Sequence, residues 1–264
     1  MNVEQFITAA ESLWPTGLAE EWDRPGLSIG SVGSELDTVL LAVDLTEEVI
    51  AEAQSVSAQL IFTHHPPLLR GVSSVSEDNR KGSLISMAVK AGICVYSAHT
   101  NADVVEDGVS DVLAKQLGLE SIRPLAISAP EIGHGRIGSL PKGSTIGTLV
   151  GALVAKLPAT TRGVSSNAQP DLAISTVALC GGAGDSFIEA AASEGADVYI
   201  TSDLRHHVAQ ESPIPVIDVS HWASESIWLE KAAEQLRALL GQTSFVVSRV
   251  NTDPWIFNQG SKSQ

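Results

Sequence analysis

The sequence predicts an α/β protein built from two compact lobes, or from one large α/β domain that carries an insertion. Short apolar runs alternate with helical patterns along most of the chain, as is typical of βα units. The chain has 264 residues, more than one hydrophobic core usually serves. With 44% hydrophobic and 18% charged residues, it can bury a sizeable core.

Seven short apolar runs have the length of buried β-strands. They are residues 38–44, 58–63, 93–98, 175–182, 196–202, 214–220 and 243–250. Helical patterns lie between them at residues 46–56, 82–92, 104–118, 185–196 and 223–241. Thr46 is a natural N-cap for the first helix, and Gly241 closes the last.

Residues 120–172 break this rhythm, because they contain several prolines and the polar stretch 160–171. We expect the chain to cross here into a central α/β lobe, residues 124–214, with a short helix at 145–157. Residues 1–123 and 215–264 are then expected to form the other lobe. The last residues, 258–264, have the composition of a disordered tail.

The charge balance excludes some partners. The chain carries 31 acids against 16 bases, a formal charge of −15, which repels nucleic acid and anionic membranes. An anionic small molecule is still compatible with it, because arginines or a metal can invert the potential inside a cleft. No apolar run is long enough to span a membrane, and the N-terminal residues lack a signal-peptide pattern, so a cytoplasmic protein is expected.

Polar side chains of the metal-ligand type follow several predicted strands. His64 and His65 follow the strand 58–63, His99 follows 93–98 with Asp103 four residues later, and His221 follows 214–220. In open α/β sheets ligands bind beyond the carboxyl ends of the strands, so we expect these groups to converge.

Glu225 lies four residues after His221, in the stretch HWASE. This spacing places both side chains on one face of a helix, where they could hold the same ion. The alternative is an ordinary pair on the helix surface.

The two adjacent histidines present a different geometry. In an extended segment their side chains point to opposite sides, so the pair is better suited to two neighbouring ions than to one. Pro66 and Pro67 follow directly and stiffen the backbone. The alternative is an incidental surface pair.

Taken together, imidazole and carboxylate groups at several strand ends match the ligands of Zn, Fe or Mn. A carboxylate such as Glu225 could bridge two ions about 3.5–4 Å apart, which activate water near neutral pH. The implied chemistry is hydrolysis.

Eight short motifs occur in the order and approximate spacing of one known family. They are EEWDRPGLSIG, THHPPLL, SAHTNAD, GHGRIG, CGGAGDS, ITSDLRHH, SHWASE and NTDP. The chain therefore resembles the NGG-interacting-factor-three-like dinuclear metal centre family, whose members are often labelled type 2 GTP cyclohydrolase I homologues. The resemblance covers residues 1 to about 255.

The resemblance implies a two-lobed fold with mixed β-sheets flanked by helices, a metal site in the cleft between the lobes, and a toroidal homohexamer. It assigns His65 and Asp103 to one ion, His64 and His221 to the other, and Glu225 to both. The chain departs from the family at Arg24, Pro25 and Ser202, and it lacks the insert of roughly a hundred residues that longer members carry.

Further residues have weaker assignments. His99 and His207 are candidate general acids or bases, or structural histidines; Asp44 could orient a ligand or cap a helix. Arg136, with His134, is the candidate contact for a phosphate or carboxylate, and a structural ion pair is the alternative. CGGAGDS is either an anion cradle or a tight turn.

These residues lead to the hypothesis of a hydrolase with two divalent metal ions that acts on a small, nucleotide-like substrate. If the cyclohydrolase label applies, water attacks C8 of a guanine nucleotide, so a C–N bond other than a peptide bond is broken. The alternative function is a hexameric scaffold or regulatory protein whose metals are structural.

Overall fold

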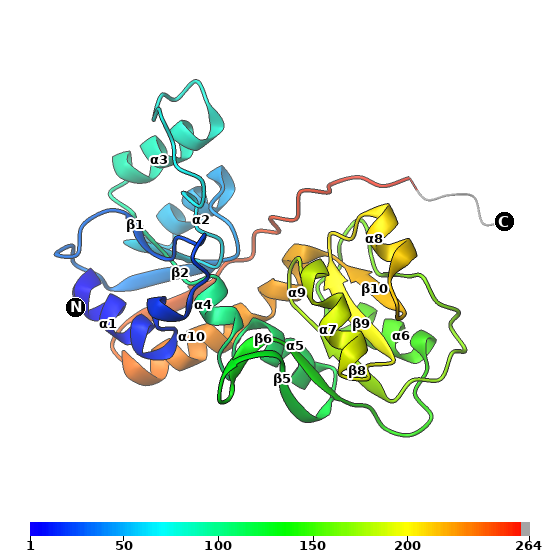
Figure 1. Cartoon of the computed structure of the whole chain (residues 1–264). Coiled ribbons are helices and arrows are strands. Elements are labelled where there is room, and N and C mark those ends of the chain that lie inside the picture. Colours follow the sequence, from blue (N-terminus) through cyan, green and yellow to red (C-terminus); the bar gives the residue numbers. More distant parts are fainter. Residues whose placement is uncertain (260–264) are drawn as a thin grey trace. The chain divides into compact units, whose positions relative to one another are not determined.

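A computed structural model describes residues 1–259. The expected disordered tail, residues 258–264, therefore lies outside the described residues except for 258–259. The chain forms two compact units, one made of Met1–Ala102 with Trp228–Thr252 and the other of Asp103–Ile227 with the residues from Asp253 on (Figure 1). These bounds differ from the expected lobes, because residues 103–123, residues 215–227 and the residues from Asp253 on lie in the second unit. The predicted α/β class is confirmed, and each unit contains a mixed β-sheet flanked by helices.

The sheet of the first unit has the strand order β1-β4-β3-β2-β11. Strands β4, β3, β2 and β11 are parallel, and the edge strand β1 runs antiparallel to β4. The strands are β1 (Gly26–Ile29), β2 (Thr38–Ala42), β3 (Leu60–Thr63), β4 (Cys94–Ser97) and β11 (Ser244–Val247). The carboxyl ends of β2, β3 and β4 therefore share one edge of this sheet.

Helices cover both faces of the first sheet. They are α1 (Val3–Leu13), the short η1 (Thr16–Leu18), α2 (Glu47–Ser55), α3 (Arg80–Lys90) and α10 (Trp228–Leu239). Ile61 and Val95 pack in the same core as α2 and α3. The next residues along the same strands, Phe62 and Tyr96, pack against Phe6 of α1 on the opposite face.

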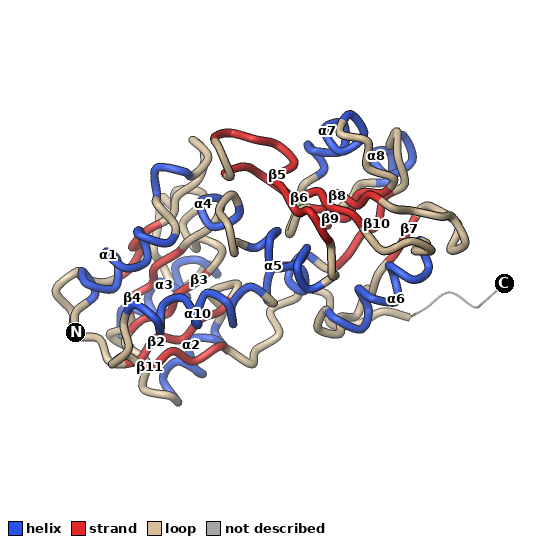
Figure 2. Tube along the Cα trace, turned by 90° about the horizontal axis from the view of Figure 1, so that it is seen from below, coloured by secondary structure: helices blue, strands red, loops and turns tan. Residues whose placement is uncertain are grey.

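The sheet of the second unit has the order β5-β6-β8-β9-β10-β7 (Figure 2). Strands β8, β9 and β10 are parallel, and the other neighbours are antiparallel. The strands are β5 (Glu120–Ala129), β6 (Ile132–Ser139), β7 (Ser165–Ser166), β8 (Thr176–Leu179), β9 (Val198–Ser202) and β10 (Val216–Val219).

Two cores lie on the two faces of this second sheet. Val177 and Leu179 pack in the core that includes α5 and α6, whereas Ala178 and Cys180 pack in the core that includes α7 and α8. The helices are α5 (Val109–Gln116), α6 (Ile146–Lys156), η2 (Asp185–Phe187), α7 (Ile188–Ser193), α8 (His206–Glu211) and α9 (His221–Ser226). A four-residue helix, α4 (Thr100–Asp103), lies where the chain enters the unit.

Two features of the fold differ from the sequence prediction. The single helix expected at 223–241 is two helices, α9 and α10, which belong to different units and are separated at Ile227. Strands β5 and β6 lie within residues 120–172, for which the sequence predicted no particular strand. Within residues 1–259, no helix is both long and apolar enough to cross a lipid bilayer.

Candidate metal centre

His64 and His65 lie directly after β3, at the carboxyl edge of the first sheet. Their backbone N–H groups donate to the carbonyls of Ala42 and Val43 (3.1 and 2.9 Å), so they continue the ladder with β2. His64 is fully buried, and 27% of the His65 side chain is exposed. The predicted divergence of the two side chains is wrong, because their ring centroids lie only 5.1 Å apart.

His99 joins these two histidines from the end of β4. The three side chains offer ligand nitrogens that lie within 4.8 Å of one another, a group that could hold a metal ion. The His99 ring centroid is 5.2 Å from that of His64 and 5.4 Å from that of His65. The first unit therefore contains a cluster of three histidines, which we call the three-histidine cluster.

Each ring of this cluster is oriented through Nδ1. The Nδ1 of His64 bonds to the carbonyl oxygen of Ala98 (2.9 Å), and that of His65 to the carboxylate of Asp44 (2.7 Å). Because both partners are pure acceptors, Nδ1 must carry the proton and donate. Nε2 is then the nitrogen available to a metal, which is the usual arrangement of metal-binding histidines.

The third histidine is oriented by a buried acid. The Nδ1 of His99 lies 2.8 Å from Oδ1 of Asp23, and Oδ2 of Asp23 accepts from the backbone and the hydroxyl of Thr100 (3.0 and 2.6 Å). Burial by itself would raise the pKa of Asp23, but these hydrogen bonds and the charge of His99 hold that pKa well below its ordinary value. Asp23 is therefore a carboxylate that fixes both the ring and its protonated nitrogen.

The second unit holds a second group, formed by His221, Glu225 and Asp203. Ser220 caps α9 by accepting from the N–H of Ala223, so the helix begins at His221. One turn later, Oε1 of the buried Glu225 lies 3.0 Å from Nε2 of His221. The Nδ1 of His221 bonds to Asp203, which follows β9, at 2.7 Å. This histidine is thus oriented like the other three.

The electrostatics of this second group favour a cation. Burial disfavours the charged imidazole, but the carboxylates of Glu225 and Asp203 outweigh burial and raise the pKa of His221 to about 11. Without a metal, the ring therefore holds a proton on Nε2 between two acids. A divalent ion at the same position would satisfy the same carboxylates, so the donor set fits a metal.

Gly182, in the turn after β8, leaves room for Glu225. Its φ of +67° is in the left-handed region, and a Cβ there would lie 2.3 Å from Oε1 of Glu225 and 3.2 Å from Nε2 of His221. A side chain at this position is therefore excluded by the position of the carboxylate. The N–H of Gly182 bonds to the Ser224 hydroxyl at 3.0 Å, so the CGGAGDS motif forms a tight turn tied to α9.

The remaining predicted residues lie in other settings. Asp103 ends α4 and is half-buried. His207 is exposed on α8, where its ring packs against His206 with centroids 5.1 Å apart. His134 lies on β6 and stacks on Phe187 (5.3 Å).

Arg136 forms a buried ion pair, the alternative left open by the sequence. Its Nε donates to Asp111 (2.9 Å). The other guanidinium nitrogens donate to the carbonyls of Gly133, Gly135, Val104 and Val105. All five N–H groups are used within the protein, so none is left to bind the predicted phosphate or carboxylate.

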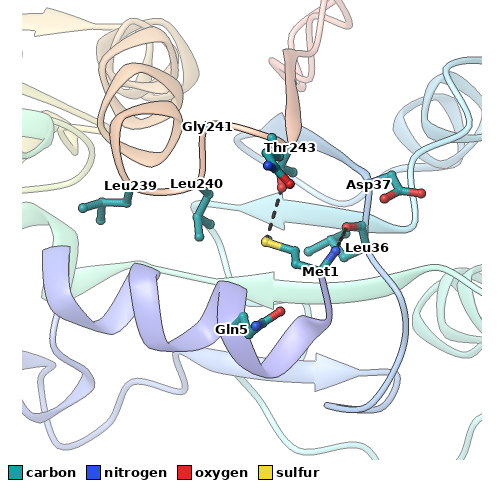
Figure 3. Close-up of a pocket in the computed structure, with 9 residues that line it drawn as sticks. Met1, Gln5, Leu36, Asp37, Leu239, Leu240, Gly241 and Thr243 are labelled. Carbon is teal, nitrogen blue, oxygen red and sulfur yellow. Dashed lines mark hydrogen bonds between the residues drawn. The ribbon is translucent and has the colours of Figure 1, made fainter.

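A separate pocket of about 320 Å³ lies in the first unit (Figure 3). Its lining includes Met1, Leu36, Leu239 and Thr243, and the Thr243 hydroxyl donates to the Met1 sulfur at 3.3 Å. Leu36 and Thr243 precede the parallel strands β2 and β11, whereas the histidines follow the ends of their strands. The pocket is therefore at the opposite edge of the sheet from the three-histidine cluster.

The fold and the histidine groups define an α/β protein with side chains that could bind metal ions. A family model, Duf34/NIF3 (NGG1p interacting factor 3), matches residues 1–254, and the chain belongs to this family. A Streptomyces coelicolor protein named GTP cyclohydrolase 1 type 2 homolog is 38% identical, over 96% of this chain and 93% of that protein. A Clostridium perfringens protein of the same name is 33% identical, over 97% and 100%.

A solved structure shows the same fold. The chain matches a Bacillus cereus protein related to NIF3 with a TM-score of 0.91 and 24% identity, over 98% of this chain and 99% of that one. This agreement confirms the fold predicted from the sequence.

Proposed function

We propose that the chain is a hydrolase that uses two divalent metal ions and acts on a small, nucleotide-like substrate. The proposal takes its ligand assignment from the family resemblance: His65 and Asp103 for one ion, His64 and His221 for the other, and Glu225 shared. The observation that carries it is that the three assigned histidines, His64, His65 and His221, each bind an acceptor through Nδ1, which directs Nε2 to a metal.

The ligand set favours catalysis over a purely structural role. Five protein ligands for two ions leave coordination positions for water and substrate, whereas structural sites are normally closed by protein side chains. Two such ions supply an activated water and polarise the bond that is broken.

His99 is the residue of this chain best placed to move a proton. It is part of the three-histidine cluster but is not one of the five assigned ligands, and Asp23 fixes its proton on Nδ1. Its Nε2 can then accept a proton from water or return one to a leaving group. The proposal also includes a homohexamer that works in the cytoplasm.

Metal analysis and activity test this proposal together. Purified protein supplied with zinc, iron or manganese should hold close to two ions per chain, and His64→Ala and His65→Ala should each lose an ion. His206→Ala, which removes an exposed histidine, is the control and should keep both. A wild-type chain that binds no metal would contradict the site.

The activity test uses GTP, phosphodiesters and cyclic amides as substrates. Turnover by the metal-loaded protein should disappear in Glu225→Gln and persist in Glu230→Gln, which changes an exposed acid nearby in the sequence. Two bound metals without turnover of any substrate would favour the hexameric scaffold instead, and light scattering would measure the assembly.

A further inference from the structure

Arg162 is a candidate for binding an anion in the second unit. It is exposed, and no ion pair or hydrogen bond of its side chain occurs among residues 1–259. The unit's other arginines are paired with acids, as Arg123 is with Glu194 at 2.7 Å. Among the arginines in the described part of the second unit, Arg162 therefore differs in having no ion-pair partner.

The sheet topology places Arg162 at the same edge as His221. Strand β7 runs antiparallel to β10, with Ser165 opposite Asp218. The residues before Ser165 therefore lead toward the carboxyl end of β10, where α9 begins. Arg162 is three residues before Ser165, and His221 is three residues after Asp218. Both residues thus lie near one end of the strand pair.

The positive charge of Arg162 acts on an acid at this end of the strand pair. Burial raises the pKa of Asp218, and Arg162 opposes this change. Arg162 therefore lies close enough to act on Asp218, the residue opposite Ser165 in the strand pair.

Trp255 holds the guanidinium in place. The central carbon of the Arg162 guanidinium lies 5.1 Å from the centroid of the Trp255 ring, within the range of a cation–π contact. The Trp255 backbone N–H bonds to Asp253 at 2.8 Å, and Asn258 donates to the carbonyl of Thr161 at 3.3 Å. A contact made through the face of the guanidinium would leave its N–H edge for a ligand.

We propose that Arg162, in cation–π contact with Trp255 near the start of α9, binds the phosphate group of a phosphorylated substrate at the candidate metal centre. The inference rests on the proposed function, because it places the substrate next to His221. Arginine suits this role, since its planar N–H pair matches two phosphate oxygens. The inference assigns a phosphate group to the substrate. Without a local positive charge, the net negative charge of the protein would repel such a group.

Calorimetric titration of the metal-loaded protein with inorganic phosphate tests this inference. Arg162→Gln should raise the dissociation constant about tenfold or more, because a charge-assisted contact is lost. Arg162→Lys keeps the charge without the planar N–H pair. Its dissociation constant for phosphate should lie between those of the wild type and Arg162→Gln. Lys156→Gln removes another exposed cation of the same unit and should bind phosphate like the wild type.

The controls separate this inference from the proposed function. If metal content is unchanged and Arg162→Gln binds phosphate as tightly as the wild type, the inference fails and the metal site stands. The same holds if the metal-loaded wild type binds no phosphate at millimolar concentration. A wild-type chain that holds no metal contradicts the proposed function itself.

Discussion

Substitution of Gly182 by alanine should damage the candidate metal site without changing any ligand. The new Cβ would lie 2.3 Å from Oε1 of Glu225, and ordinary contact begins at 3.4 Å, so the overlap is 3.4 − 2.3 = 1.1 Å. Glu225 is buried and bonded to His221, so it cannot swing into solvent to relieve this overlap. Metal sites need ligands within about 0.5 Å of their working positions.

We therefore expect Gly182→Ala to weaken metal binding at least about tenfold, the lower end of the loss seen when the surroundings of a metal ligand are disturbed. Gly182 also has a positive φ, which costs an alanine on the order of 1 kcal/mol of folding free energy. Metal titration by calorimetry measures the first effect, and chemical denaturation measures the second.

Gly195→Ala is the matched control. Gly195 has a φ of +77°, close to the +67° of Gly182, but within residues 1–259 no heavy atom beyond its two chain neighbours lies within 4 Å of its Cβ position. It should carry the same backbone cost and bind metal normally. Equal metal affinity in the two alanine variants would refute the reasoning, because it would show that the position of Glu225 does not matter for the metal.

Three further outcomes are expected. Asp44→Asn should lower metal affinity about tenfold while the chain stays folded, because His65 loses its charged partner; metal titration and circular dichroism measure this. Arg136→Met should destabilise the protein by about 3–5 kcal/mol in chemical denaturation, since Asp111 loses one of its two cationic partners and four backbone carbonyls lose the guanidinium as their donor. Burial would raise the pKa of Asp111, but its bonds to Lys115 and Arg136 lower this pKa below the ordinary value of 3.8. The ionised Asp111 therefore stabilises the fold at pH values above 3.8, and this stabilisation is lost as the pH falls through the pKa of Asp111 in the folded protein. Asp111→Asn should be less stable than wild type at neutral pH and lose less stability on acidification; parallel curves for the two proteins would contradict this.

The sequence was most informative where apolar runs are buried on both faces. Strands β2, β3 and β4 lie inside the predicted runs 38–44, 58–63 and 93–98, because near-continuous burial leaves a strong local pattern. The N-cap at Thr46 is confirmed by its bond from the N–H of Val49. These features depend on residues that are neighbours in the sequence.

The position of a strand in the sheet explains why β5 was missed. No strand was predicted around Pro124, but β5 is an edge strand, where a missing N–H costs little. The break at Ile227 could not be predicted because the helical pattern of the sequence continues through it. Helices α9 and α10 are separate because they belong to different units.

The candidate ligands could be found from sequence, but most of their orienting partners could not. His99 and Asp23 are 76 residues apart, His65 and Asp44 are 21 apart, and His221 and Asp203 are 18 apart. No local pattern links such pairs. Asp44 was open to this role because it ends a predicted strand, whereas Asp23 and Asp203 acquired it only from the structure.

The Nδ1 contacts of the four histidines affect how a relative that has lost metal binding would be recognised. Three of them end on acids from segments other than those that carry the histidines. A relative can therefore keep the THHPP and SHWASE motifs unchanged and still bind metal poorly, if it has exchanged one of these acids. Comparing only the ligand positions would count that protein as a metal binder, so the three acids belong in any motif used to sort members of the family.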